Sequence, residues 1–225
     1  MANYVLVHGA WGGSHTWGEV PGRLRAEGHA VVVATLPGLG TRQHELHPGI
    51  TLADHVTAVC DQVEEAGFER FVLAGHSYGG MVITGVASRL GKRIDAICYI
   101  DAFWPDDDQS LWDITGAFEH DWYIRTQRHR PGYVVPIGAQ DFEVVPNVVG
   151  YHPLLTLLEA QRLSGEEKAI PKTSYIFATG YQPTPFPRFA EKAKRLGAEY
   201  HETASDHFVM QNDPDLTVRV LSGLA

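Results

Sequence analysis

Short apolar runs alternate with longer amphipathic stretches along most of the chain. Apolar runs rich in β-branched residues predict buried strands at 4–8, 30–36, 70–75, 94–101, 173–179 and 198–203. Apolar residues at helical spacing predict helices at 16–27, 51–66, 78–90, 186–196 and 214–224, and Thr51 can cap the second of them. Strands that alternate with helices in this way favour an α/β fold with a mostly parallel sheet covered by helices on both faces.

The rhythm breaks between residues 105 and 170. Nine aromatic residues, Phe142 among them, fall within the 49 positions from 103 to 151, and residues 154–163 have a helical pattern. We interpret this segment as an inserted helical cap over the carboxyl edge of the sheet. The predicted organisation is a core of residues 1–104 and 171–225 with a cap of residues 105–170.

The stretch Val72 to Val82, "VLAGHSYGGMV", combines the end of a strand with the start of a helix. Its Gly75-x-Ser77-x-Gly79 pattern is typical of a sharp turn that exposes a nucleophilic serine, with glycines where neighbouring backbone must approach. The pattern alone is a weak signal, and a bystander serine in a tight loop is the alternative. The flanking strand and helix favour Ser77 as a nucleophile.

A serine nucleophile needs a base, and in such folds the acid and then the histidine follow it along the chain. Among the 12 histidines, His207 is the one that directly follows the last predicted strand. A surface-loop histidine is the alternative. We predict that His207 is the base.

The acid is expected near the end of a late strand. The loop after 173–179 contains no Asp or Glu, whereas Asp101 ends the strand before it, close to the expected position of His207. We predict Asp101 as the acid. Asp206, adjacent to His207, and Glu202, inside the last strand, are the weaker alternatives.

The oxyanion of an acyl-transfer reaction needs two N–H donors. We expect these from the backbone of Tyr78 and of Ala10 in the loop "HGAWGG", with Trp11 as the second choice for the latter. The glycines of this loop do not form a dinucleotide-binding motif, and His44-x-x-His47 is a weak ligand pair, so no metal site is expected.

Composition and charge limit the classes of binding partner that the chain can have. The chain of 225 residues is 44% hydrophobic and has a formal net charge of −9, without clusters of Lys or Arg. Such a balance disfavours nucleic acid and anionic membranes as partners and leaves a homodimer open. With no signal peptide, no spanning segment and two isolated cysteines, we expect a cytoplasmic protein with free thiols.

The stretches "VLVHGAWGGSHTW", "LPGLG", "GHSYGGMV", "AFWPDD" and "DHFVMQNDP" together resemble the α/β-hydrolase superfamily, and within it the plant methyl esterase and hydroxynitrile lyase group with its bacterial relatives. The resemblance is strongest over 4–105 and 200–214 and weak in the cap. It implies a sheet of about six strands, no cofactor, and the roles given above for Ser77, His207 and the two amides.

Two departures from that group matter. Its plant members place the acid after the penultimate strand, where this chain has Tyr181, so Asp101 rests on strand-end geometry. Its lyases use a Thr and a Lys at positions that here are Gly9 and Phe208, so the resemblance favours hydrolysis.

The resulting hypothesis is a serine hydrolase that cleaves an ester or carbamate of a small, apolar, aromatic compound, with foreign compounds as one substrate class. The residues expected to contact the substrate are Trp11, Phe103, Trp104, Trp112 and Phe208. A C–C lyase, a non-catalytic ligand-binding protein and a cofactor-free dioxygenase on the same fold are the alternatives.

Overall fold

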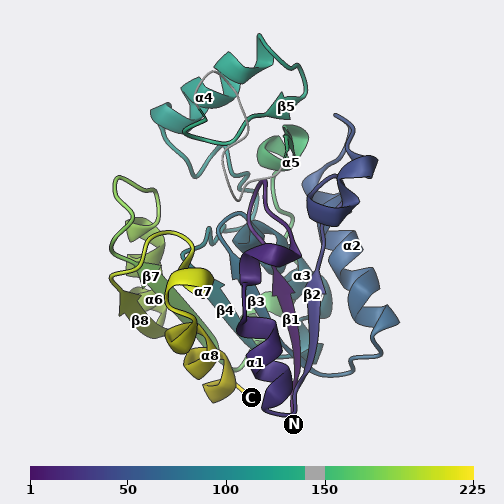
Figure 1. Cartoon of the computed structure of the whole chain (residues 1–225), viewed down its shortest axis with the longest axis vertical. Helices are drawn as coiled ribbons and strands as arrows, with labels where there is room; N and C mark the ends of the chain where they lie inside the picture. The colour runs from purple at the N-terminus through teal and green to yellow at the C-terminus, as the bar shows by residue number, and fades with distance from the viewer. Residues whose placement is uncertain (140–149) are drawn as a thin grey trace.

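The computed structural model describes residues 1–139 and 150–225. Its main sheet has six parallel strands, which confirms the predicted parallel sheet of about six strands. Their order is β2-β1-β3-β4-β7-β8 (Figure 1). The strands are β1 (Asn3–Val7), β2 (Ala30–Ala34), β3 (Phe71–His76), β4 (Ile94–Ile100), β7 (Thr173–Ala178) and β8 (Glu199–Thr203). A separate antiparallel pair is formed by β5 (Tyr133–Val134) and β6 (His152–Pro153).

Helices cover the sheet on both faces. The α-helices of the core are α1 (Val20–Ala26), α2 (Leu52–Glu65), α3 (Gly79–Leu90), α6 (Pro187–Leu196), α7 (Val209–Asn212) and α8 (Pro214–Gly223). Short 3-10 helices are η1 (Ser14–Trp17), η2 (Gly40–Glu45), η3 (Gly91–Arg93) and η5 (Glu166–Ala169).

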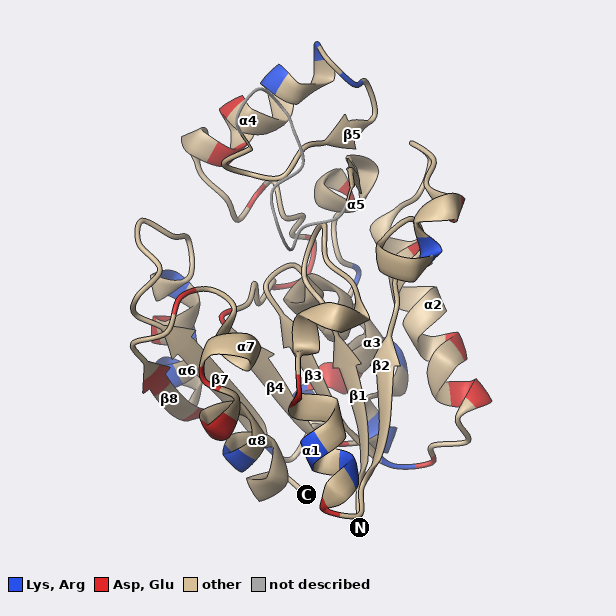
Figure 2. Ribbon diagram, in the orientation of Figure 1, with Lys and Arg blue, Asp and Glu red and all other residues tan. Residues whose placement is uncertain are grey.

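Successive residues of the central strands enter two different cores. In β1, Tyr4 and Leu6 belong to the core that contains residues of α1 and α8, whereas Val5 and Val7 belong to the core that contains residues of α2, α3 and α6. Alternate side chains of a strand point to opposite faces, so an uninterrupted apolar run is what a sheet covered twice requires. Charged residues therefore lie mainly on helices and loops, and β1, β3 and β4 carry none except Asp95 (Figure 2).

The start of α2 follows the predicted capping chemistry. Thr51 Oγ1 accepts a hydrogen bond from the Asp54 N–H at 3.3 Å, and the Thr51 N–H donates to Asp54 Oδ2 at 2.9 Å. This reciprocal pair satisfies backbone donors that the first helical turn leaves unpaired. The prediction of Thr51 as the N-cap is confirmed.

Two predicted helices are shorter in the structure. Residues 16–27 form the end of η1 and then α1, because Gly18 has a φ of 53° and interrupts the helix. Of residues 154–163, only α5 (Leu155–Leu158) is helical. The chain turns extended at Glu159, whose carboxylate accepts a hydrogen bond from the Ala53 N–H at 2.7 Å. Tertiary pairing thus overrides the local helical pattern.

The segment interpreted as a cap lies beyond the carboxyl ends of the strands (Figure 1). It contains α4 (Ala117–Gln127), β5, β6 and α5, while residues 140–149, including the aromatic Phe142 counted above, lie outside the described residues. The chain is already back against the core at Ser164, whose N–H donates to Ser88 Oγ of α3 at 2.7 Å. In the described part of the chain, the helices are all too short or too polar to traverse a bilayer.

Candidate active site

Ser77 occupies the sharp turn between β3 and α3. Its φ of 54° lies in the left-handed region, which costs a non-glycine residue free energy. The surrounding backbone holds it there, because the Ser77 N–H donates to the Ile100 carbonyl at 3.2 Å and the Phe103 N–H donates to the Ser77 carbonyl at 3.1 Å.

The two flanking glycines are needed for space. A Cβ on Gly75 would lie 2.8 Å from the Gly79 carbonyl oxygen, and a Cβ on Gly79 would lie 2.7 Å from the Val7 carbonyl oxygen. Any side chain at either position would push the helix away from the sheet. The motif spacing therefore follows from how closely β3, α3 and β1 approach one another.

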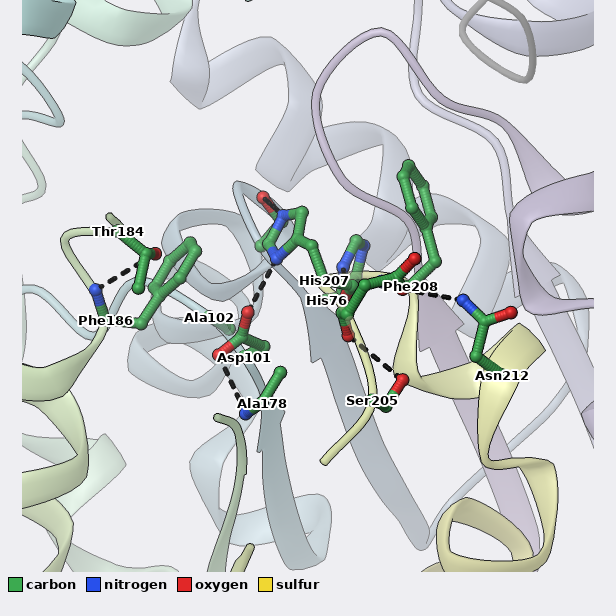
Figure 3. Close-up of polar contacts among 12 residues, drawn as sticks. His76, Asp101, Ala102, Ala178, Thr184, Phe186, Ser205, His207, Phe208 and Asn212 are labelled. Atoms are coloured by element: carbon green, nitrogen blue, oxygen red, sulfur yellow. Dashed lines mark hydrogen bonds and ion pairs between the residues drawn. The ribbon is translucent and has the colours of Figure 1, made fainter. Parts of the chain in front are cut away.

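A hydroxyl, an imidazole and a carboxylate form one hydrogen-bonded chain at the carboxyl edge of the sheet. His207 Nε2 lies 2.9 Å from Ser77 Oγ. His207 Nδ1 lies 2.7 Å from Asp101 Oδ2, as Figure 3 shows. Asp101 follows β4 with a φ of 40°, is fully buried, and accepts a second hydrogen bond from the Ala178 N–H at 3.2 Å. The structure brings the three sequence-predicted side chains together.

The two alternative carboxylates are engaged elsewhere. Asp206 Oδ1 accepts hydrogen bonds from the Phe208 N–H at 2.9 Å and from Asn212 Nδ2 at 2.6 Å. Glu202 Oε1 accepts a hydrogen bond from the Tyr200 hydroxyl at 2.6 Å and is exposed. Asp101 is thus the carboxylate bonded to the imidazole.

Burial shifts the pKa values of the two titratable side chains, His207 and Asp101, that bond to each other here. It lowers the pKa of the His207 imidazole below its ordinary value, and the charge of Asp206 partly opposes the shift. It raises the pKa of Asp101, which the hydrogen bond from Ala178 partly offsets. Because the two groups are in direct contact, protons enter and leave them as a pair.

Two backbone amides lie beside Ser77, one in the loop after β1 and one at the start of α3. Among the described residues, no carbonyl or side chain accepts from the N–H of Ala10 or of Tyr78. The Trp11 N–H, the second choice above, donates to His152 Nδ1 at 3.4 Å. The loop comes this close because a Cβ on Gly9 would lie only 2.9 Å from Ser77 Cβ.

A cavity of about 290 Å³ opens beside Ser77. Its lining is mostly apolar and includes Ala10, Trp11, Phe103, Leu111, Ile137, Phe186 and Phe208. Glu119 of α4 and Tyr181 are among its polar members, and the described lining includes no Lys or Arg. Of the residues expected to contact a substrate, Trp11, Phe103 and Phe208 line this cavity.

Trp104 and Trp112 lie away from this cavity, so their prediction as substrate contacts is corrected. Trp104 stacks on Tyr99 with centroids 4.6 Å apart and has Lys192 Nζ 5.2 Å from its ring centroid. Trp112 stacks on His120 at 3.8 Å within the segment that carries α4. Both indoles contribute to packing, which a count of aromatic residues cannot distinguish from substrate contact.

A polar network ties the loop after β1 to the segment beyond the sheet. Besides its contact with Trp11, His152 lies 2.7 Å from Thr156 Oγ1 through Nε2. The Trp11 indole N–H donates to the Val134 carbonyl at 2.8 Å. No motif in the sequence marks His152, because only the fold places it beside this loop.

A histidine of α2 supports the sharp turn between β3 and α3. The Tyr78 hydroxyl donates to His55 Nδ1 at 2.8 Å, and His55 Nε2 donates to the Pro37 carbonyl at 3.0 Å. Burial lowers the pKa of His55 to about 3, which keeps the ring neutral and able to accept a hydrogen bond.

Among residues 1–139 and 150–225, no three His, Cys, Asp or Glu side chains are grouped as a metal site.

Residues 4–220 match the sequence profile described as "Alpha/beta hydrolase family". The "Carbendazim hydrolyzing esterase" of Nocardioides sp. (strain SG-4G) is 34% identical to this chain over 241 aligned residues, covering 100% of both proteins. "Salicylic acid-binding protein 2" of Nicotiana tabacum is 32% identical over 105 residues, which are 46% of this chain and 40% of the tobacco protein.

Solved structures show the same architecture. An extracellular alpha/beta-hydrolase from a Paenibacillus species superposes with a TM-score of 0.84 at 22% identity, covering 100% of this chain and 99% of that one. A pyrethroid hydrolase from Sphingobium faniae JZ-2 gives a TM-score of 0.76 at 18% identity, with 99% and 96% covered. These likenesses concern the fold. With the sequence match over nearly its whole length, the chain belongs to the alpha/beta hydrolase family.

Proposed function

We propose that this protein is a serine hydrolase that cleaves a carboxylic ester or carbamate of a small, apolar, aromatic compound through an acyl-enzyme. The observation that carries the proposal is the hydrogen-bonded chain from Asp101 through His207 to Ser77 beside an apolar cavity. The 34% identity to an esterase that is named for carbendazim hydrolysis supports the same reaction class.

In the first half-reaction, Ser77 Oγ attacks the substrate carbonyl carbon while its proton passes to His207 Nε2. The C=O π electrons move to oxygen, and the charge that develops there is stabilised by the N–H groups of Ala10 and Tyr78. As the carbonyl re-forms, the bond to the leaving alcohol or amine breaks, and that group takes the proton from Nε2. The acyl group remains on Ser77.

In the second half-reaction, water replaces the departed group. His207 Nε2 takes a proton from the water as its oxygen attacks the acyl carbon. The bond between that carbon and Ser77 Oγ then breaks as Nε2 returns a proton to Oγ, and the acid is released. Asp101 accepts the Nδ1–H bond throughout, which fixes the tautomer and stabilises the imidazolium. Its burial and its second donor, Ala178, keep the carboxylate in one orientation.

The cavity favours uncharged substrates. Apolar side chains dominate its lining, and the carboxylate of Glu119 is present without a cation among the described lining residues. A substrate or ligand that carries its own carboxylate would meet a negative charge and no partner. This observation argues against the binding of a free aromatic acid as the main function.

The substrate class is tested with purified protein and a panel of methyl, aryl and carbamate esters, including carbendazim. We expect turnover of uncharged aromatic members and loss of that turnover in Ser77→Ala. A Glu119→Gln variant keeps the hydrogen-bonding shape, and we expect it to improve kcat/KM for anionic esters relative to neutral ones. Wild-type turnover by Ser77→Ala, or the absence of turnover for every ester and carbamate, would contradict the proposal.

A further inference from the structure

We propose that Tyr181 and Phe186 act as positioning residues that stabilise the positively charged form of the His207 imidazole and so strengthen it as a base. This inference rests on the proposed function, in which His207 gains a proton from Ser77. It assigns a role to the loop between β7 and α6, a loop that contains no carboxylate.

Both rings lie nearly parallel to the imidazole. The Tyr181 ring centroid is 4.7 Å from that of His207 with an interplanar angle of 24°, and the Phe186 centroid is 5.0 Å away with an angle of 14°. Figure 3 shows Phe186 on one side of the imidazole and His76 on the other. A cation is attracted to the negative face of an aromatic ring at such distances.

Burial makes this contact important. The His207 side chain is only 17% exposed, so little water can solvate an imidazolium there. Phe186 is 2% exposed, and the stacking therefore occurs in surroundings that screen charge weakly. Cation–π attraction is strongest where both partners have lost water. The rings offset part of the free energy that the buried imidazole loses when it becomes charged.

Two carboxyl groups share this task with the rings. Asp101 Oδ2 accepts the hydrogen bond from His207 Nδ1, and the charge of Asp206 raises the pKa of His207 from the neighbouring position. His76 donates through Nε2 to the His207 carbonyl at 2.8 Å, and burial lowers its pKa, so it carries no charge at neutral pH. Burial and the charges of Asp101 and Glu119 raise the pKa of Tyr181, which therefore stacks as a neutral phenol.

Tyr181 lies at the rim of the cavity and outside the hydrophobic core. The residue is 36% exposed, and its hydroxyl has no hydrogen-bond partner among the described residues. This half-exposed aromatic ring therefore stacks on His207 without a hydrogen bond from a described residue to fix its hydroxyl. The imidazolium exists only between the two proton transfers, so attraction to it favours the transition state over the resting enzyme.

The test measures the pKa of His207 in two independent ways. One is the pH dependence of kcat/KM for p-nitrophenyl acetate, which reports the free enzyme. The other is a ¹⁵N NMR titration of the resting protein, with His207→Gln used to assign the signal. We expect Tyr181→Leu to lower both values by about one unit and kcat by roughly tenfold.

Matched variants separate this role from packing. Tyr181→Phe keeps the aromatic face, so His207 should keep its wild-type pKa in this variant. Phe186→Leu should lower the pKa of His207 as Tyr181→Leu does. Tyr133→Leu makes the same change away from the imidazole and should leave the pKa unchanged. An unchanged pKa in Tyr181→Leu, while turnover still depends on Ser77, would overturn the inference alone. Full turnover by both Ser77→Ala and His207→Gln would instead overturn the proposed function.

Discussion

At the residue scale, backbone strain gathers around the proposed catalytic centre. Trp11, Ser77 and Asp101 all have positive φ, at 56°, 54° and 40°. Such conformations persist where the surrounding structure over-determines them, which is typical of functional sites. The glycine spacing around Ser77 signals its strain in the sequence. Nothing in the sequence signals the other two, because their strain comes from contacts that exist only in the fold.

Asp101 and Asp206 make a matched pair for mutation. Asp101→Asn should lower kcat by about 10³- to 10⁴-fold with little change in KM, since an amide in contact with Nδ1 favours the wrong imidazole tautomer. Asp206→Asn should lower kcat less than about tenfold, because that carboxylate bonds Phe208 and Asn212 instead. Steady-state kinetics on one neutral aryl ester measures both. Equal losses in the two variants would contradict the assignment of Asp101.

At the element scale, the order and type of the strands and helices follow from hydrophobic periodicity. The predictions that were wrong share one cause, which is contact between elements that are distant in sequence. Glu159 leaves the predicted 154–163 helix to accept a hydrogen bond from Ala53 of α2, and Trp104 packs on Tyr99 rather than into the cavity. Periodicity identifies which residues are apolar but not which neighbouring element each one contacts. Glu119 and His152 were missed for the same reason.

Two substitutions of His152 can separate its contact with the loop after β1 from its contact with Thr156. His152→Asn places an acceptor near the position of Nδ1 and keeps the bond from the Trp11 N–H, whereas His152→Gln keeps the donor to Thr156 near Nε2. If the loop orients the Ala10 amide, kcat should fall about tenfold or more in His152→Gln and less in His152→Asn, with KM nearly constant. A larger loss in His152→Asn would refute this coupling.

At the scale of the whole molecule, the parallel sheet assembles the site. The ends of β3 and β4 and the loop after β8 meet at one edge, so residues 77, 101 and 207 converge although they are far apart in sequence. Chain order and strand-end position were enough to predict these three. The aromatic stacking on His207 was not predictable, because it depends on the path of the loop after β7.

The same architecture buries several neutral histidines, which makes stability depend on pH. Burial lowers the pKa of His8 to about 4 and of His55 to about 3, and it lowers those of His76 and His152 well below the ordinary value. Between pH 6.5 and about 4, these four histidines bind more protons in the unfolded chain than in the folded one. Their contribution to stability is therefore complete above about pH 6.5 and is lost as the pH falls.

Urea unfolding at pH 7.5 and pH 5 measures this loss. Each buried histidine can contribute up to about 2 kcal/mol over that interval, at about 1.4 kcal/mol per pH unit below 6.5. His55→Gln can bond Pro37 and Tyr78 without titrating, and it should reduce the loss, whereas replacing the exposed His44 by Gln should not. Equal stability at both pH values would show that these histidines are not held neutral.

Covalent labelling by a fluorophosphonate, followed by mass spectrometry of the labelled peptide, tests most directly whether Ser77 is an activated nucleophile. We expect one adduct per chain on Ser77, loss of esterase activity in proportion to labelling, and labelling that is at least about a hundredfold slower in His207→Gln. Labelling at another residue, or equal rates in the wild type and His207→Gln, would contradict this expectation.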